Sequence, residues 1–230
     1  MLAVVAAFAF LPTHMNILVF SKTAGFRHDS IPTGQEMFQE LGKAHGFTVQ
    51  GSEDASLFTP YNLRKYDAVV FLSTTGDVLN EGQQKALEEF IKRGGGYIGI
   101  HAAADTEYNW PWYGELVGAY FLSHPQIQEA EVVNEAPQNP TVSMWPAKFR
   151  RKDEWYDYKV NPRGKVTVLA SLNTGSYQGS KMPGDHPIIW CREFDGGRAW
   201  YTGFGHTKET YAEPEFRKMI VAALGWVVGG

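Results

Sequence analysis

Short, continuously apolar runs alternate with amphipathic segments along the first hundred residues. Each run has four to seven residues, the length typical of strands buried in a parallel sheet. Strands are therefore predicted at residues 16–21, 47–50, 67–73 and 97–100.

The segments between these runs carry helix signals. Ser30 is a candidate N-cap with Pro32 just inside the helix, and Gly46 supplies a stop. Asn80 caps a second helix, which is predicted over the sequence EGQQKALEEFIKRGGG. The resulting βαβ rhythm predicts a parallel sheet with helices on both faces.

The pattern changes after Asp105. Aromatic residues crowd together, and short apolar runs separated by Pro and Gly follow. Further strands are predicted at residues 127–134, 166–172, 188–194 and 198–202. Residues 195–197 (Asp-Gly-Gly) indicate a hairpin between the last two strands, and residues 214–229 read as a helix that packs back on the sheet.

Composition narrows the class of protein. The chain has 230 residues, of which 43% are hydrophobic, so we expect a single domain over residues 15–230. The net charge of −4, with charges of both signs interspersed, argues against a nucleic-acid partner. Cys191 is the only cysteine, which excludes an internal disulfide, and its apolar surroundings indicate an inert core thiol.

The first fourteen residues contain an apolar run that is too short to span a bilayer. They lack the basic start and the cleavage pattern of a secretory signal, so they are either an apolar leader or a mis-assigned start. Localisation stays open between the cytoplasm and, if this segment is a signal peptide, the periplasm or exterior. The number of subunits is also left open.

Histidines and carboxylates gather beside predicted strand ends and in loops, in the sequences GFRHDS, GIHAAAD, LSHP, KDEWYDY, GDHP and GFGH. The candidate catalytic residues in these clusters are His28, His101, Asp105, Glu154 and His206. The candidate substrate-binding residues are Phe26, Arg27, His124, Asp153, Tyr156, His186 and Trp190.

Three of these histidines follow strands that would be parallel neighbours in one sheet. His28 follows the first strand, His101 the fourth and His206 the last, so we expect the three rings to meet at the carboxyl edge of the sheet, where open α/β sheets bind ligands. Imidazoles beside carboxylates suit general acid and base catalysis. The same groups could bind a divalent metal, although no short-spaced ligand motif is present.

Other chemistries are disfavoured. GIHAA has the form of a nucleophile elbow, but His101 stands where Ser or Cys would be, which argues against covalent acyl transfer. The glycines of GGGYIG precede their strand and so do not match a dinucleotide fingerprint. Aromatic residues make up 14% of the chain, and those beside carboxylates are candidates for binding sugar rings, the alternative being core packing.

Taken together, the motifs LVFSKTAGFRHDSI, GGGYIGIHAAAD, FLSHP, DEWYDY and RAWYTGFGH resemble the ThuA-like family, named for trehalose utilisation. This family is grouped in the class I glutamine amidotransferase-like superfamily. The resemblance covers residues 16–228. It implies a flavodoxin-like three-layer α/β sandwich with a mainly parallel central sheet, in which His101 replaces the amidotransferase cysteine.

The resemblance also implies a chemistry. Members are associated with the use of disaccharides through 3-keto derivatives, in which a base removes the C2 proton, the C1 substituent leaves and water adds back. His101 or Glu154 is then the expected base, His206 or His28 the expected acid, and a metal or Arg27 the group that polarises the ketone. The adjacent residues Asp153 and Glu154 point in different directions if their segment is extended.

Two readings of function follow. The first is an enzyme that cleaves a keto-disaccharide or glycoside, with a small-molecule sugar as its partner. The second is a carbohydrate-binding or regulatory module that retained the fold without the chemistry. Both exclude an active glutamine amidotransferase, because the required thiol is missing.

Overall fold

A computed structural model of the protein describes residues 15–229. The expected apolar leader, residues 1–14, lies outside the described residues. No helix within residues 15–229 combines the length and apolar character needed to cross a bilayer.

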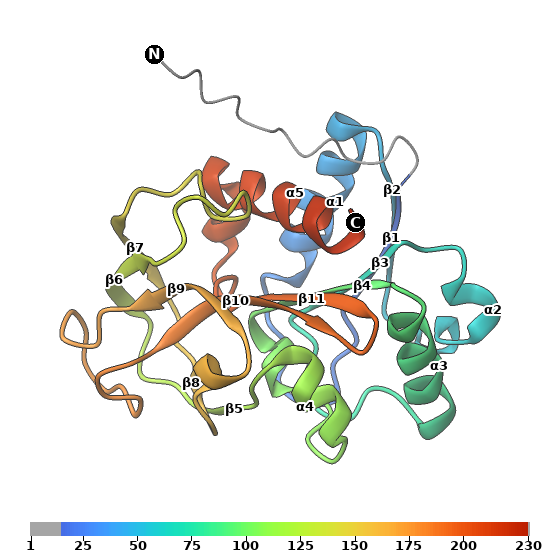
Figure 1. The fold of residues 1–230 in the computed structure, drawn as a ribbon, viewed down its shortest axis with the longest axis horizontal. Helices are drawn as coiled ribbons and strands as arrows, with labels where there is room; N and C mark the ends of the chain where they lie inside the picture. Colours follow the sequence, from blue (N-terminus) through green and yellow to red (C-terminus); the bar gives the residue numbers. More distant parts are fainter. Residues whose placement is uncertain (1–14, 230) are drawn as a thin grey trace.

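Within these residues nine strands form one sheet in the order β2-β1-β3-β4-β11-β10-β9-β6-β7 (Figure 1). In chain order they are β1 (Asn16–Phe20), β2 (Thr48–Ser52), β3 (Ala68–Leu72), β4 (Gly96–Ile100), β6 (Gln128–Asn134), β7 (Lys148–Asp153), β9 (Thr167–Leu172), β10 (Pro187–Phe194) and β11 (Gly197–Thr202). The eight predicted strands are confirmed, with small shifts at their ends.

The sheet has two halves, and this corrects the expectation of a mainly parallel sheet. Strands β2, β1, β3, β4 and β11 are parallel, whereas β10, β9, β6 and β7 each pair antiparallel with their neighbours. The reversal occurs at the predicted hairpin between β10 and β11. Asp195 and Gly196 both have positive φ, 49° and 95°, as the twist-matched two-residue hairpin turn requires.

Helices cover both faces of the parallel half. Helices α1 (Ile31–His45) and α5 (Pro214–Val228) lie on one face, and α3 (Glu81–Lys92) and α4 (Pro111–Val117) lie on the other (Figure 1). The short helix α2 (Pro60–Leu63) packs beside α3. As predicted, α5 packs back on the sheet: a Cβ added to Gly96 of β4 would lie only 2.8 Å from Val227 Cγ2. Close helix–sheet packing therefore requires a glycine here.

All three predicted cap positions are confirmed, and two of them make the expected capping hydrogen bonds. Asn80 forms a full capping box with Gln83, and Gly46 closes α1 in the left-handed conformation, φ 79°. Ser30 occupies the cap position of α1, but its hydroxyl makes no cap bond; it donates instead to the carbonyl oxygen of Gly205, 3.2 Å away. This residue therefore ties the start of α1 to the loop that follows β11.

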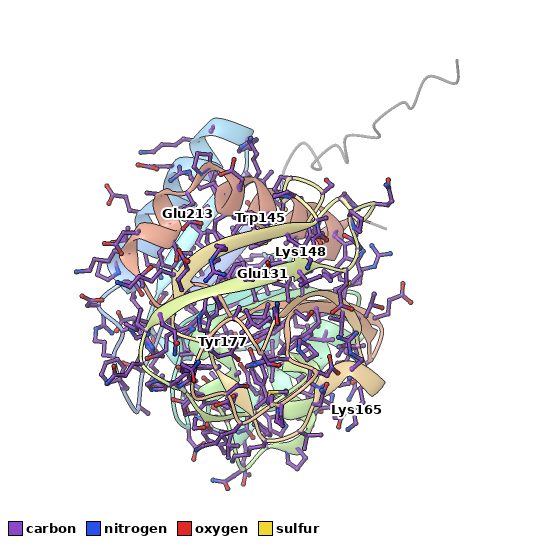
Figure 2. All side chains as sticks on the ribbon, turned by 90° about the vertical axis from the view of Figure 1, so that its left-hand side faces the viewer. Glu131, Trp145, Lys148, Lys165, Tyr177 and Glu213 are labelled. Atoms are coloured by element: carbon purple, nitrogen blue, oxygen red, sulfur yellow. The ribbon has the colours of Figure 1, made fainter. Side chains whose placement is uncertain are left out.

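Three strands were not predicted. Strand β7 has the sequence KFRRKD, whose charged residues hide the alternation expected of a strand. It forms the edge of the sheet, where charges discourage pairing with other chains. Lys148 Nζ on β7 lies 3.5 Å from Glu131 Oε1 on β6, and Figure 2 shows the two residues side by side. Strands β5 (Phe121–Ser123) and β8 (Asp157–Tyr158) form a small separate sheet and are too short for a pattern to show.

The apolar core accounts for the protonation state of the Cys191 thiol. Its side chain is buried on β10, and burial raises the pKa of the thiol to about 11. The thiol is therefore protonated at neutral pH, in agreement with the prediction of an inert core residue.

Candidate functional site

Three strands of the parallel half deliver histidines to one place. β1, β4 and β11 run parallel, and the segments that follow them carry His28, His101 and His206. The ring centroid of His28 lies 4.9 Å from that of His101 and 5.0 Å from that of His206. The ring centroids of His101 and His206 are 5.2 Å apart. The predicted meeting of the three rings is thus confirmed, well within the span of one bound sugar ring.

A carboxylate from the antiparallel half completes the group. Glu154 directly follows β7, and its Oε2 lies 3.0 Å from His206 Nδ1 and 3.4 Å from His101 Nε2. We call His28, His101, His206 and Glu154 the His–Glu cluster. One potential ligand atom of each member lies within 4.8 Å of those of the other three, so the cluster has a donor set that could hold a metal ion.

The backbone at His101 is strained. β4 ends at Ile100, and His101 adopts φ 50°, a left-handed conformation that costs a residue with a side chain about 1 kcal/mol or more. This sharp turn aims the imidazole away from the strand, as the elbow-like sequence predicted. Tyr201 on the neighbouring strand β11 holds the turn, since its hydroxyl donates to the His101 carbonyl oxygen at 2.8 Å.

The protonation of His101 follows from its surroundings. Its Nδ1 lies 3.0 Å from the carbonyl oxygen of Gly203, which can only accept a hydrogen bond. Nδ1 therefore carries the proton in the neutral ring, and Nε2 presents a lone pair to His206 and Glu154.

Asp153 and Glu154 point in different directions, as predicted for adjacent residues of an extended segment. Asp153 is fully buried, and its carboxylate accepts hydrogen bonds from the backbone N–H groups of Gly205 and His206, at 3.0 and 3.1 Å. It also pairs with Arg151 at 3.3 Å. Asp153 thus positions the His206 loop instead of facing a ligand.

Charge in the cluster is unevenly distributed. Burial alone would raise the pKa of Glu154, but the electrostatic effect of the neighbouring His101 and His206 and the contact with His206 Nδ1 lower it well below the usual range, so this carboxyl group is ionised. Burial likewise opposes a charge on His206, yet its hydrogen bond with Glu154 raises the pKa of this histidine overall. For His28, burial and the neighbouring imidazoles lower the pKa to about 3, which leaves this ring neutral.

Aromatic rings and a half-exposed histidine border the cluster. Tyr156 packs on His101 with centroids 4.2 Å apart, and Phe26, which is 66% exposed, lies edge-on to His28 at 4.9 Å. The side chain of His124 is 42% exposed, and its Nδ1 lies 3.1 Å from Glu154 Oε1. A ligand would reach the cluster from this side, past His124 and the partly exposed His206.

Asp105 lies close to this border, at the end of the short 3-10 helix η2 (His101–Asp105) that begins at His101. It is partly exposed, and its Oδ1 accepts a hydrogen bond of 2.5 Å from the Tyr108 hydroxyl. Burial raises the pKa of Asp105 above its ordinary value, which brings this carboxyl group nearer to the range useful for proton transfer.

Three predicted binding residues lie elsewhere. Arg27 forms a surface ion pair with Glu53, 2.7 Å apart, and half of its side chain is exposed. Trp190 is in the core, where it stacks on Tyr201 at 4.3 Å and offers no free face. His186 is fully buried under the Tyr156 backbone. Sequence clustering could not separate these residues from the site, because the orientation of a side chain depends on its strand neighbours.

The sequence also missed residues that support the site. The carbonyl group of Gly203 and the hydroxyl group of Tyr201 orient His101, and Thr210 donates to Asp153 at 3.2 Å. The pairing of Tyr201 with Gly99, two residues before His101, places its hydroxyl group there. No pattern within one segment reveals such a cross-strand relation.

The fold and the site define an α/β protein with a histidine–carboxylate centre at the carboxyl edge of its parallel strands. A family model described as "Trehalose utilisation" (ThuA) matches residues 16–227. The chain therefore belongs to the ThuA family, as the sequence motifs indicated, and the family description points to a carbohydrate-related role. Among curated proteins, no sequence matches.

Solved structures with the same fold include two ThuA-like proteins. One, from Bacteroides uniformis ATCC 8492, is 26% identical with a TM-score of 0.80, and the match covers 98% of this chain and 96% of that one. The other, from Parabacteroides merdae ATCC 43184, is 19% identical with a TM-score of 0.76 and coverages of 94% and 90%. A β-galactosidase from Bacillus circulans shares the fold over 91% of this chain but only 30% of its own, with 12% identity and a TM-score of 0.60.

Proposed function

We propose that this protein is a carbohydrate-processing enzyme that cleaves a 3-keto disaccharide or glycoside, such as a keto derivative of trehalose, by acid/base-assisted elimination. The observation that carries the proposal is the His–Glu cluster, in which three imidazoles and an ionised carboxylate meet beside the exposed ring of Phe26 and the buried ring of Tyr156. The family description supports a sugar as the substrate.

The chemistry requires three tasks. A base takes the proton from C2, and the electrons of that C–H bond form a C1=C2 double bond. The C1–O bond breaks, and an acid protonates the leaving oxygen. A third group binds the C3 keto oxygen and stabilises the negative charge that develops on it.

The structure favours a particular division of these tasks. Asp105 has a raised pKa and is partly exposed, and His124 is the most exposed histidine beside the cluster, so both suit proton transfer. Within the His–Glu cluster, His206 is partly exposed and its pKa is raised by Glu154, so as an imidazolium it suits donation of a hydrogen bond to the keto oxygen. Arg27 is less suited to that task because it is engaged with Glu53 at the surface.

The superfamily assignment is part of the proposal. The order β2-β1-β3-β4-β11 is that of a flavodoxin-like sheet, and helices on both of its faces support a three-layer sandwich over one domain. His101 sits on a strained turn after β4, the position of a nucleophile in an elbow. Because Cys191 is buried on β10, it cannot serve as the thiol of an amidotransferase.

The test is incubation of the purified protein with 3-keto-trehalose and 3-keto-glucosides while the release of free sugar is followed. We expect release by the wild type, loss of at least about 100-fold in kcat/KM for His101→Gln, and no change for His45→Gln. His45 is an exposed histidine at the end of α1, which makes it a matched control.

A ligand-binding measurement on the same proteins separates the two readings. If the wild type binds the sugars but releases no product under any metal condition, the binding-module interpretation replaces the enzyme. If it neither binds nor cleaves them, the proposed substrate class is wrong.

A further inference from the structure

The His–Glu cluster contains a buried nitrogen without a partner. His28 is 3% exposed, and its Nδ1 has no hydrogen-bond partner among the described residues. Leaving a buried polar atom unpaired destabilises the folded state, so such an atom in a folded protein calls for a specific explanation. Its location within a group of other donors points to a missing ligand instead of a packing defect.

The neighbouring atoms also require a positive charge between them. The bond from His101 Nδ1 to Gly203 leaves a lone pair on Nε2, which lies 3.4 Å from the carboxylate oxygen Oε2 of Glu154. Two acceptors that face each other repel unless a proton or a cation lies between them. His206 Nδ1 lies 3.2 Å from His101 Nε2 and 3.0 Å from Glu154 Oε2, so it can supply one proton to this pair. That proton leaves His28 Nδ1 without a partner.

The spacing fits a metal ion. Zn²⁺ binds imidazole nitrogen and carboxylate oxygen at about 2.0–2.2 Å, so neighbouring ligands of a tetrahedral site lie about 3.4 Å apart. The three measured separations of 3.0, 3.2 and 3.4 Å lie close to this value, and all four donors fall within 4.8 Å. Small adjustments of the partly exposed His206 would complete the site.

We propose that His28, His101, His206 and Glu154 together bind one divalent transition-metal ion. Three imidazoles and one carboxylate favour Zn²⁺ and its neighbours Fe²⁺, Co²⁺, Ni²⁺ and Mn²⁺ over Mg²⁺ and Ca²⁺, which prefer oxygen donors. When bound, such an ion polarises a carbonyl oxygen as a Lewis acid.

The supporting residues match those of metal sites. A ligating histidine usually donates its second N–H to a carbonyl or carboxylate group, as His101 does toward Gly203. Asp153 fixes the other side, because its carboxylate holds the backbone N–H groups of both Glu154 and His206. Two of the four ligands are thus oriented from one buried residue.

The test measures metal binding in the absence of any sugar. The full chain is stripped with EDTA, titrated with Zn²⁺ by calorimetry, and loaded with Co²⁺, whose visible absorption bands report the number and geometry of its ligands. We expect one ion per chain, the bands of a four- or five-coordinate Co²⁺ ion, and a rise in Tm of about 5–10 °C at a free Zn²⁺ concentration 100 times Kd.

Variants assign the ligands. The three single variants are Glu154→Gln, which preserves the shape of the side chain, His28→Gln and His206→Gln. Each is expected to weaken Zn²⁺ binding by at least about 10-fold and to change the Co²⁺ spectrum. His45→Gln is expected to bind as the wild type does. Far-UV circular dichroism shows whether each variant is folded, and the wild-type titration decides the matter even if a variant fails to fold.

Opposite results overturn the proposal. Less than a tenth of an equivalent of bound Zn²⁺ in the stripped wild type, or binding unchanged in all three ligand variants, excludes this site. Metal binding without sugar release would support the metal centre and contradict the proposed reaction. Sugar release that persists in EDTA with no bound metal would support the reaction and contradict the metal centre.

Discussion

The protein buries imidazoles in two different ways. His186 is fully satisfied: its Nε2 donates to the Tyr156 carbonyl oxygen at 2.8 Å, and its Nδ1 accepts from the Tyr177 hydroxyl at 2.6 Å. In the His–Glu cluster, by contrast, His28 Nδ1 has no partner among the described residues, and His101 presents a lone pair to a carboxylate. His186, His28 and His101 are buried to a similar degree, so burial alone does not distinguish the two environments.

The difference lies in whether the protein by itself completes the hydrogen bonds. A buried polar group with every partner supplied by the chain stabilises one conformation and needs nothing further. A buried group left incomplete costs stability and persists where a ligand completes it. The same residue type therefore serves structure in one region and, we propose, binding and catalysis in the other.

The largest expected effect concerns the satisfied histidine. His186→Ala leaves the Tyr156 carbonyl and the Tyr177 hydroxyl buried without their partner and opens a cavity, so we expect a loss of about 2–4 kcal/mol in the free energy of unfolding. Urea denaturation measures it, with His45→Ala as an exposed control expected to change by less than about 0.5 kcal/mol. A His186 variant as stable as the wild type would remove the contrast between the two regions.

The pH dependence of stability provides a second test of His186. Burial lowers the pKa of this histidine in the folded protein, so below the ordinary histidine pKa of about 6.5 the unfolded chain binds more protons than the folded one. Its contribution to stability is therefore complete above that pH and is lost as the pH falls.

We expect the wild type to lose more stability between pH 7 and 5 than His186→Gln does, by at most about 1.4 kcal/mol per pH unit. Urea denaturation across this range checks it. Parallel pH curves for the two proteins would mean that His186 carries the same charge in both states.

The incomplete histidine should behave in the opposite manner. His28→Leu removes an unpaired buried nitrogen while keeping apolar volume, so the stability of the metal-free protein should change by no more than about 1 kcal/mol and can increase. Sugar release and Zn²⁺ binding should both fall. Thermal unfolding in EDTA gives the first quantity, and a loss of 3 kcal/mol or more would show that His28 is a structural residue like His186.

The smallest effect concerns the rim of the cluster. Phe26 is 66% exposed and touches His28 only at its edge, so Phe26→Ala should raise the KM for a keto-sugar by about 2–5-fold and leave kcat unchanged. Tyr61→Ala, at an aromatic residue that is 74% exposed on α2, is the control. An equal change in both variants, or a fall in kcat, would separate Phe26 from substrate binding.

Part of the site could be predicted from sequence because strand ends are local features. The runs that precede His28, His101 and His206 mark them as residues following parallel strands, and parallel strands share a carboxyl edge. Glu154 was a candidate for a weaker reason, its place in a cluster of charged and aromatic residues. Strand β7, which delivers it, carries no hydrophobic alternation and was not predicted.

The sequence by itself thus determined eight of the nine strands of the large sheet, the positions of the helix caps, the hairpin and the meeting of three histidines, because each depends on patterns within a few residues. Only the tertiary structure decided which of Asp153 and Glu154 faces the imidazoles, and that Trp190 and His186 belong to the core. The physical reason is that burial and hydrogen bonding depend on partners from distant segments, such as the Gly203 carbonyl that fixes the protonation of His101. No stretch of the chain encodes those partners alone.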